Sequence, residues 1–246
     1  GKPLIIQLRR DGQVLDVEVT PLFDEKEKAY RLGLYIRDSA AGIGTLTFVH
    51  PQSKKYGALG HVISDLDTGK PIHSTDGQIV HSRITAIQKG EHGQPGEKYA
   101  TFISEKEPLG NIEKNTSFGV FGIVHGTMKN EYFSDPIAVA LPEQVEVGPA
   151  QIFTVIQGDK IEAFDIEIVK VFPQKHPSTK GMIIRVTDPK LLKETGGIVQ
   201  GMSGSPIVQN NRLVGAVTHV FVNDPTSGYG IHIEWMLDEA EIDYAD

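Results

Sequence analysis

The chain has no cysteine, which excludes disulfide bonds, thiolate catalysis and cysteine-ligated metal centres. It also has no apolar run near the roughly 18 residues of a membrane-spanning helix, so no transmembrane segment is expected. Lysine and arginine (24 residues) are fewer than aspartate and glutamate (32 residues) and form no basic run. We therefore expect neither nucleic acid nor an anionic membrane surface as the main partner.

Motifs that hold metals or phosphates are missing as well. There is no His-Glu-Xaa-Xaa-His sequence, and Asp65-Leu66-Asp67-Thr68-Gly69 lacks the distal glutamate of a calcium loop. The glycines of Gly42-Ile43-Gly44 precede a strand pattern rather than a helix pattern. The sequence thus predicts neither a metal nor a cofactor.

Short β-rich runs separated by glycine and proline turns follow one another from Leu34 onward, and this spacing predicts an all-β fold of sandwich or barrel type. Helical patterns are limited to 190–194 and a C-terminal segment, 233–240. Ahead of this region, two alternating runs within 4–20 flank Asp11-Gly12, a strong hairpin signal.

The N-terminal pattern resembles the last two strands of a PDZ domain, with most of that domain expected outside this chain. We therefore predict a PDZ remnant (1–21), a charged linker (22–33), a first β-barrel (34–140), and a second β-barrel with a short C-terminal helix (141–246). No secretory signal peptide is visible, but a chain that begins inside a domain would not show one.

A candidate nucleophile stands in the segment Gly201-Met202-Ser203-Gly204-Ser205-Pro206. The two glycines allow backbone conformations that other residues resist, so the turn can expose the Ser203 hydroxyl and aim successive N–H groups at one point. Acyl transfer needs such a nucleophile beside an oxyanion hole, here predicted from the N–H groups of Gly201 and Ser203. Ser205 is interpreted as a turn residue.

A serine hydroxyl needs a hydrogen-bonded base, and the chain offers nine histidines. His61 differs from the others because it follows Gly57-Ala58-Leu59-Gly60, whose small residues let other groups approach closely. His125 is the second candidate for the base. His219 and His232 are interpreted as pocket or packing residues.

The segment from Gly201 to Val208, the strand Leu213–Val217 and the run Gly228-Tyr229-Gly230-Ile231 together resemble the nucleophile region of chymotrypsin-like serine peptidases. A closer resemblance, which includes Tyr56–His61 and Val124-His125-Gly126, is to the stage IV sporulation protein B (SpoIVB) family. The resemblance implies two packed six-stranded barrels, with His61 as base and Ser203 as nucleophile.

The resemblance also implies Asp188 as the acid that orients His61. Asp188 lies 15 residues before Ser203, in the second barrel, whereas chymotrypsin-like enzymes take this acid from the first barrel. Asp188-Pro189 is also a common turn opener. Asp65, Asp67 and Asp165 are the alternatives. Thr218, His219 and Asn115 are candidates for the substrate pocket, and the absence of acidic residues in 196–198 and 218–220 predicts no preference for lysine or arginine.

Members of the family are exported from the forespore into the space between two membranes. There they cleave a membrane-bound inhibitor of an intramembrane metalloprotease, and they also cleave themselves. The resemblance therefore implies a serine endopeptidase of sporulation signalling with these protein substrates. The alternative hypothesis is a catalytically latent chymotrypsin-like binding or scaffold module.

Overall fold

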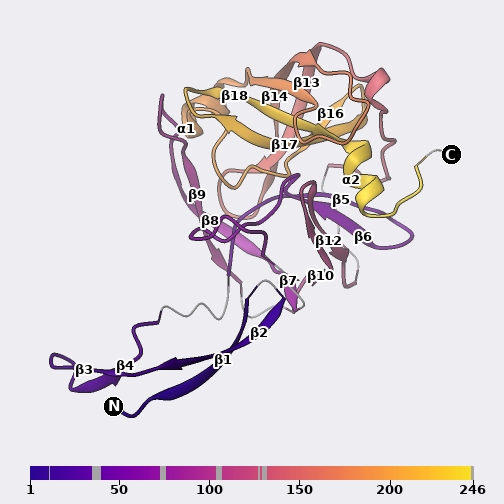
Figure 1. Ribbon diagram of the computed structural model, residues 1–246. Coiled ribbons are helices and arrows are strands. Elements are labelled where there is room, and N and C mark those ends of the chain that lie inside the picture. Colours follow the sequence, from indigo (N-terminus) through magenta and orange to yellow (C-terminus); the bar gives the residue numbers. More distant parts are fainter. Residues whose placement is uncertain are drawn as a thin grey trace. The chain divides into compact units, whose positions relative to one another are not determined.

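A computed structural model describes residues 1–10, 12–34, 40–72, 76–103, 107–126, 128 and 132–244. The chain divides into two compact units, Gly1–Ala41 and Gly42–Asp246, and each is described by itself. The larger unit holds every candidate site residue (Figure 1).

The smaller unit consists of two hairpins. Strands β1 (Leu4–Arg10) and β2 (Gln13–Val19) pair antiparallel, which confirms the predicted hairpin. Gly12 has φ of 81°, a left-handed conformation that favours glycine in a tight turn. The predicted partner in this turn, Asp11, lies outside the described residues. The segment predicted as a linker carries a second hairpin, β3 (Leu22–Asp24) with β4 (Ala29–Arg31).

The C-terminal part of the larger unit is a closed six-stranded barrel with the strand order β13-β14-β15-β18-β17-β16. Apolar side chains alternate toward its interior, where Ile152, Ile184 and Ile207 are fully buried. The strands are β13 (Gly148–Val155), β14 (Ile161–Val171), β15 (Met182–Val186), β16 (Pro206–Gln209), β17 (Arg212–Phe221) and β18 (Asp224–His232).

The N-terminal part of the larger unit contains shorter strands, arranged in three small sheets within the described residues. The sheet β11-β12-β6-β5 comprises β5 (Leu46–Val49), β6 (Lys55–Ala58), β11 (Lys114–Thr116) and β12 (Gly119–Ile123). The two-stranded sheets are β7 (Gly77–Ile79) with β10 (Gly110–Ile112), and β8 (Ser82–Gln88) with β9 (Glu97–Phe102). The predicted all-β class is confirmed, and the second predicted barrel is closed, whereas the first half of this unit forms separate sheets.

Helices are few and short, as the sequence predicts. Helix α1 (Pro189–Thr195) begins after Asp188, whose carboxylate accepts the Leu191 N–H, and ends at Gly196 with φ of 73°. Helix α2 (Ile233–Glu239) follows β18, and a 3₁₀ turn, η1, spans Pro142–Gln144. No helix in the described part of the chain is long and apolar enough to cross a membrane.

Candidate active site

The turn that carries Ser203 depends on its two glycines. Gly201 and Gly204 have φ of 92° and 87°, values that side-chain-bearing residues rarely adopt. A Cβ atom on Gly204 would stand 2.1 Å from the Thr45 carbonyl oxygen and 2.4 Å from the Leu59 nitrogen. Gly204 is therefore needed for its conformation and for the close approach of the neighbouring backbone.

Alternate amides of this turn are left without an acceptor. Met202 donates to the Val199 carbonyl at 3.1 Å, and Gly204 donates to the Val217 carbonyl at 2.8 Å. Within the described part of the chain, the N–H groups of Gly201 and Ser203 donate to no protein acceptor. The two N–H groups predicted to form an oxyanion hole are thus the ones available to a ligand.

The Ser203 hydroxyl donates to the Thr218 carbonyl of β17, with an Oγ–O distance of 3.0 Å. Ser203 and His61 share no hydrogen bond in this arrangement, in which both residues are described. The neighbouring Ser205 is fully buried, and its hydroxyl lies 3.4 Å from Thr45 Oγ1. Of the two serine hydroxyls, only that of Ser203 is partly accessible.

Strand β5 and the residue before it hold the turn from the other side. The Thr45 N–H donates to the Ser203 carbonyl at 2.9 Å, and the Thr47 hydroxyl donates to the Gly204 carbonyl at 2.8 Å. Thr47 is 6% exposed, so this bond is shielded from water. Sequence reasoning missed both threonines, because contacts across more than 150 residues leave no local signal.

His61 lies at the end of a strained turn that follows β6. Leu59 and Gly60 both have φ of 70°, which is unusual for leucine. A Cβ on Gly60 would stand 2.9 Å from Thr218 Cγ2, so glycine permits this segment to approach β17. The predicted reason for small residues before His61 is therefore seen at Gly60. Gly60, the residue before His61, and Ser203 therefore both lie against Thr218.

The imidazole of His61 is oriented by a backbone carbonyl. Its Nδ1 lies 2.9 Å from the Val62 carbonyl oxygen. Because a carbonyl oxygen can only accept, Nδ1 must carry the proton, which leaves the lone pair of Nε2 free in the neutral ring. This is the tautomer that a general base requires, and an aspartate enforces the same tautomer in the Ser-His-Asp triad.

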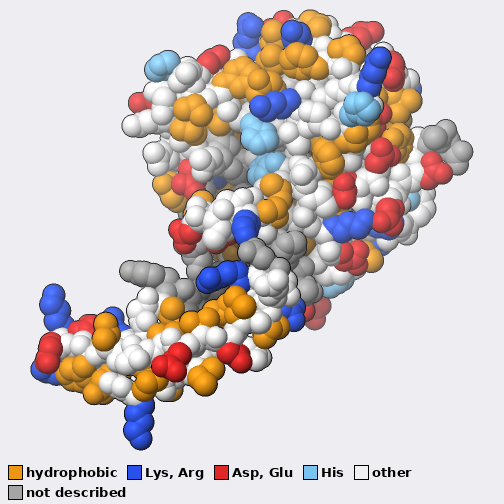
Figure 2. Space-filling model, viewed as in Figure 1, with side chains coloured by type: hydrophobic (Ala, Val, Ile, Leu, Met, Phe, Trp, Pro, Cys, Tyr) orange, Lys and Arg blue, Asp and Glu red, His pale blue; other side chains and the backbone are white. Residues whose placement is uncertain are grey.

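His219 lies beside His61, and the centroids of the two rings are 5.4 Å apart. Partial burial lowers the pKa of His219, and the nearby His61 and Lys180 lower it further. His219 is therefore neutral over a wider pH range than an exposed histidine. Figure 2 shows histidine side chains together on the surface of the larger unit.

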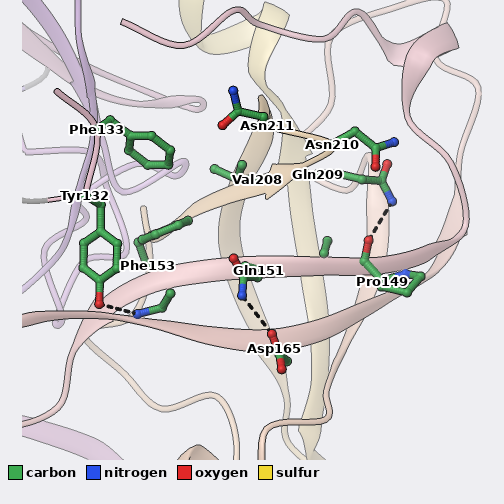
Figure 3. A pocket seen from close by; sticks show the side chains of 12 residues that line it. Tyr132, Phe133, Pro149, Gln151, Phe153, Asp165, Val208, Gln209, Asn210 and Asn211 are labelled. Atoms are coloured by element: carbon green, nitrogen blue, oxygen red, sulfur yellow. Dashed lines mark hydrogen bonds between the residues drawn. The ribbon is translucent and has the colours of Figure 1, made fainter. Parts of the chain in front are cut away.

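The predicted acid, Asp188, lies at the start of α1. Its carboxylate accepts the N–H groups of Leu191 at 2.9 Å and Asp165 at 3.5 Å, and it forms no hydrogen bond with His61. Asp165 in turn accepts from the Gln151 amide at 2.9 Å, on a hollow in the outer face of the barrel (Figure 3). Neither Ser203 nor His61 lines that hollow. Asp65 accepts the Asp67 and Thr68 N–H groups of its own turn.

The remaining candidates hold backbone in place. Asn115 bonds the Ile63 N–H and carbonyl at 2.8 Å each and the Ile72 carbonyl at 2.9 Å, thereby bridging the loop after His61. The Thr218 hydroxyl lies 3.2 Å from the carbonyl oxygens of both Thr179 and Tyr229, and its single proton can be donated to either or shared between them. For Asn115 and Thr218, a role in substrate binding stays a prediction.

The other two candidate histidines, His125 and His232, differ in their burial. His125 is exposed on the loop that follows β12. His232 is 1% exposed and packs against Gly181, and burial lowers its pKa. Burial makes His232 a packing residue, as the sequence predicts, whereas the role of His125 as an alternative base stays a prediction.

Comparison with known proteins places the chain among peptidases. A family model described as SpoIVB peptidase S55 matches residues 28–237. A crystal structure of the Rv3671c protease, inactive form, is similar at 13% identity and a TM-score of 0.37, covering 65% of this chain and 87% of that one. The active form of the same protease, from M. tuberculosis, gives 14% identity and a TM-score of 0.39, covering 86% and 96%. A search of curated proteins found no match.

Proposed function

Because this chain belongs to the SpoIVB peptidase S55 family and is therefore a serine peptidase, we propose that Ser203 is its nucleophile and His61 its general base. The observation that carries this assignment is the pair of free N–H groups on Gly201 and Ser203, in a turn whose serine hydroxyl is partly accessible. The position of Gly60, the residue before His61, against the same Thr218 that accepts the Ser203 hydroxyl supports this pairing.

The reaction begins when the Ser203 hydroxyl rotates from the Thr218 carbonyl toward Nε2 of His61. Nε2 accepts the proton as Oγ attacks the peptide carbonyl carbon, and the oxyanion receives hydrogen bonds from the Gly201 and Ser203 N–H groups. His61 then gives the proton to the leaving amine. An acyl-enzyme remains. His61 takes a proton from a water molecule, which attacks the acyl carbon, and the bond from this carbon to Ser203 Oγ breaks as His61 returns the proton to Oγ.

Asp188 is the third residue of the proposed site, an assignment that rests on the family resemblance. Its carboxylate caps α1, and α1 leads through Gly196 directly into the segment that ends at Ser203. Loss of the cap would therefore loosen the start of α1 and, through this helix, disturb the position of Ser203. Direct contact with His61 would instead require the carboxylate to release the Leu191 N–H.

The family further supports protein substrates in sporulation signalling. We propose that the enzyme acts after export from the forespore, on a membrane-associated regulator such as the inhibitor of an intramembrane metalloprotease. We also propose that it cleaves its own chain. The exposed, short hairpins of the smaller unit offer accessible backbone for such a cut.

Self-cleavage gives a direct test that needs no external substrate. The Ser203→Ala chain, labelled with a heavy isotope, is incubated alone and with the unlabelled wild-type protein, and fragments are identified by mass spectrometry. We expect heavy fragments when the wild-type protein is added and none when the Ser203→Ala chain is incubated alone. Ser205→Ala, if it folds, should produce the same heavy fragments when it replaces the wild-type protein as the added enzyme. Cleavage activity in purified Ser203→Ala at the wild-type rate would overturn the assignment.

A latent binding module is the second candidate, and one observation favours it. The Ser203 hydroxyl bonds to Thr218 rather than to His61, so the pair required for attack is not joined. A wild-type protein that is folded and cleaves neither itself nor casein would support this alternative.

A further inference from the structure

A lysine is buried beside the nucleophile turn. Lys98 lies in β9 of the β8–β9 ribbon (Ser82–Gln88 with Glu97–Phe102), and it alone is buried among the six residues of this strand, all of which are described. Lys98 is 2% exposed, whereas the apolar Tyr99 and Phe102 of the same strand are 45% and 46% exposed. A buried amine without compensation is unfavourable, so its location calls for a specific role.

The backbone around Lys98 is paired with the residue that precedes Gly201. The Lys98 N–H donates to the Gln200 carbonyl at 3.0 Å, and the Gln200 N–H donates to the Gly96 carbonyl at 2.8 Å. These two bonds form a parallel bridge between β9 and the nucleophile segment. The peptide plane that carries the Gly201 N–H includes the Gln200 carbonyl, so this bridge fixes its direction.

The side chain of Lys98 also packs against Gly201, next to the same peptide. A Cβ atom on Gly201 would stand 3.2 Å from both Cβ and Cδ of Lys98. The Lys98 amine extends into the second barrel, where Nζ donates to the hydroxyl of Thr154 on β13 at 2.7 Å. Thr154 is 1% exposed, so both ends of this bond are shielded from water.

The amine is held by a neutral partner. No carboxylate in the described part of the chain forms an ion pair with Lys98, and burial lowers its pKa to about 7. Near neutral pH a large share of the amine is therefore uncharged. The bond to Thr154 selects one conformation of the flexible lysine side chain. An apolar residue of similar length would lack this bond.

We propose that Lys98 is a positioning residue that sets the direction of the Gly201 N–H in the oxyanion hole. Its anchored side chain packs against Gly201 and holds β9 where the main chain of this strand bonds Gln200. The inference rests on the proposed function, because it assigns Lys98 to the oxyanion hole of that site. Lys98 acts on the transition state through Gly201, and it touches neither the substrate nor the nucleophile.

The test separates transition-state stabilisation from substrate binding. Lys98→Ala, Lys98→Met and the matched control Lys170→Ala, an exposed lysine on β14, are compared with wild type. Hydrolysis of p-nitrophenyl butyrate gives kcat and KM, normalised to sites titrated with a fluorophosphonate. Phenylboronic acid, which forms a tetrahedral adduct with an active serine, reports the oxyanion hole by its inhibition constant.

We expect Lys98→Ala to lower kcat by about 10- to 100-fold and to raise the inhibition constant of phenylboronic acid by a similar factor, with KM changed less than about twofold. Lys98→Met, which preserves the volume, should show a smaller loss of the same kind and decides the question if Lys98→Ala does not fold. Lys170→Ala should match wild type.

Two failures are distinguishable. If the folded Lys98 variants keep the wild-type kcat and boronate affinity per titrated site, the role of Lys98 is overturned and the proposed function stands. If the wild-type protein reacts with neither the fluorophosphonate nor the ester, the proposed function itself fails.

Discussion

Replacing Lys98 by methionine should change the pH dependence of stability in a direction fixed by the burial of the amine. The pKa of Lys98 falls from its ordinary value of 10.5 to about 7 in the folded protein. Between these two pH values the unfolded chain binds more protons than the folded one. The free energy of unfolding of the wild type therefore rises, through this group, as the pH increases from 7 to 10.5.

The magnitude follows from the size of the shift. At about 1.4 kcal/mol per pKa unit, the buried amine destabilises the folded state by roughly 5 kcal/mol at pH 7 and below. Methionine removes this cost but leaves the Thr154 hydroxyl without its partner, a loss of about 1–3 kcal/mol that does not depend on pH. Lys98→Met should thus be more stable than wild type by roughly 2–4 kcal/mol near pH 7.

Urea unfolding of both proteins at pH 7 and pH 10, followed by circular dichroism, measures this difference. The advantage of Lys98→Met should shrink by several kcal/mol at pH 10, because pH 10 lies only about half a unit below the ordinary pKa of 10.5, so losing the proton on folding then costs little. Taking the difference between the two proteins cancels the titration of all other groups. An advantage of equal size at both pH values would refute the buried, neutral amine.

Substitutions of Gly204 and Asp188 test the construction of the site. Gly204→Ala should destabilise the protein by about 2–4 kcal/mol and abolish activity, since the new Cβ would stand 2.1 Å from the Thr45 carbonyl oxygen. Gly158→Ala is the matched control, because Gly158 also has a positive φ, 64°, but no atom lies within 4 Å of its new Cβ. This control should cost only about 1–2 kcal/mol. Asp188→Asn should keep the α1 cap and most of the stability, whereas Asp188→Ala should lose about 1 kcal/mol. If Asp188 acts only through α1, the asparagine variant keeps near-normal kcat, and a loss of about 10⁴-fold in a folded Asp188→Asn would instead show the direct role with His61.

The parts of the site that could be predicted from the sequence are those with a local conformational signature. The glycines around Ser203 indicated a turn with available N–H groups, and Gly60 indicated a close approach next to His61. The apolar runs 206–208, 213–220 and 229–233 predicted three final strands, and the structure confirms all three. The last strand, however, begins at Asp224, within the segment 223–228 that was predicted to be a loop.

The parts that could not be predicted depend on contacts between distant segments. Thr47 and Gly204 are 157 residues apart, and a threonine in a strand gives no sign of its partner. Lys98 is more misleading, because a lysine in an alternating strand predicts exposure to solvent. The Val62 carbonyl that orients His61 is a backbone group, which no side-chain motif can indicate.

The interpretation of Asp188 shows two signals in competition. The family resemblance predicted a contact with His61, and the local Asp188-Pro189 sequence favoured a turn or a helix start. In the structure the local preference is visible, because aspartate before a proline is a strong N-cap and its carboxylate accepts the Leu191 N–H. The role of Asp188 in catalysis stays a prediction.

The proposed activity requires that Ser203 and His61 act together as nucleophile and general base. The most direct measurement is the rate and site of reaction with a fluorophosphonate probe, read by mass spectrometry of the digested protein. We predict a single adduct on Ser203 in the wild type, none in Ser203→Ala, and labelling at least about 100-fold slower in His61→Ala. An adduct on another residue, or labelling of His61→Ala at the wild-type rate, would contradict the claim.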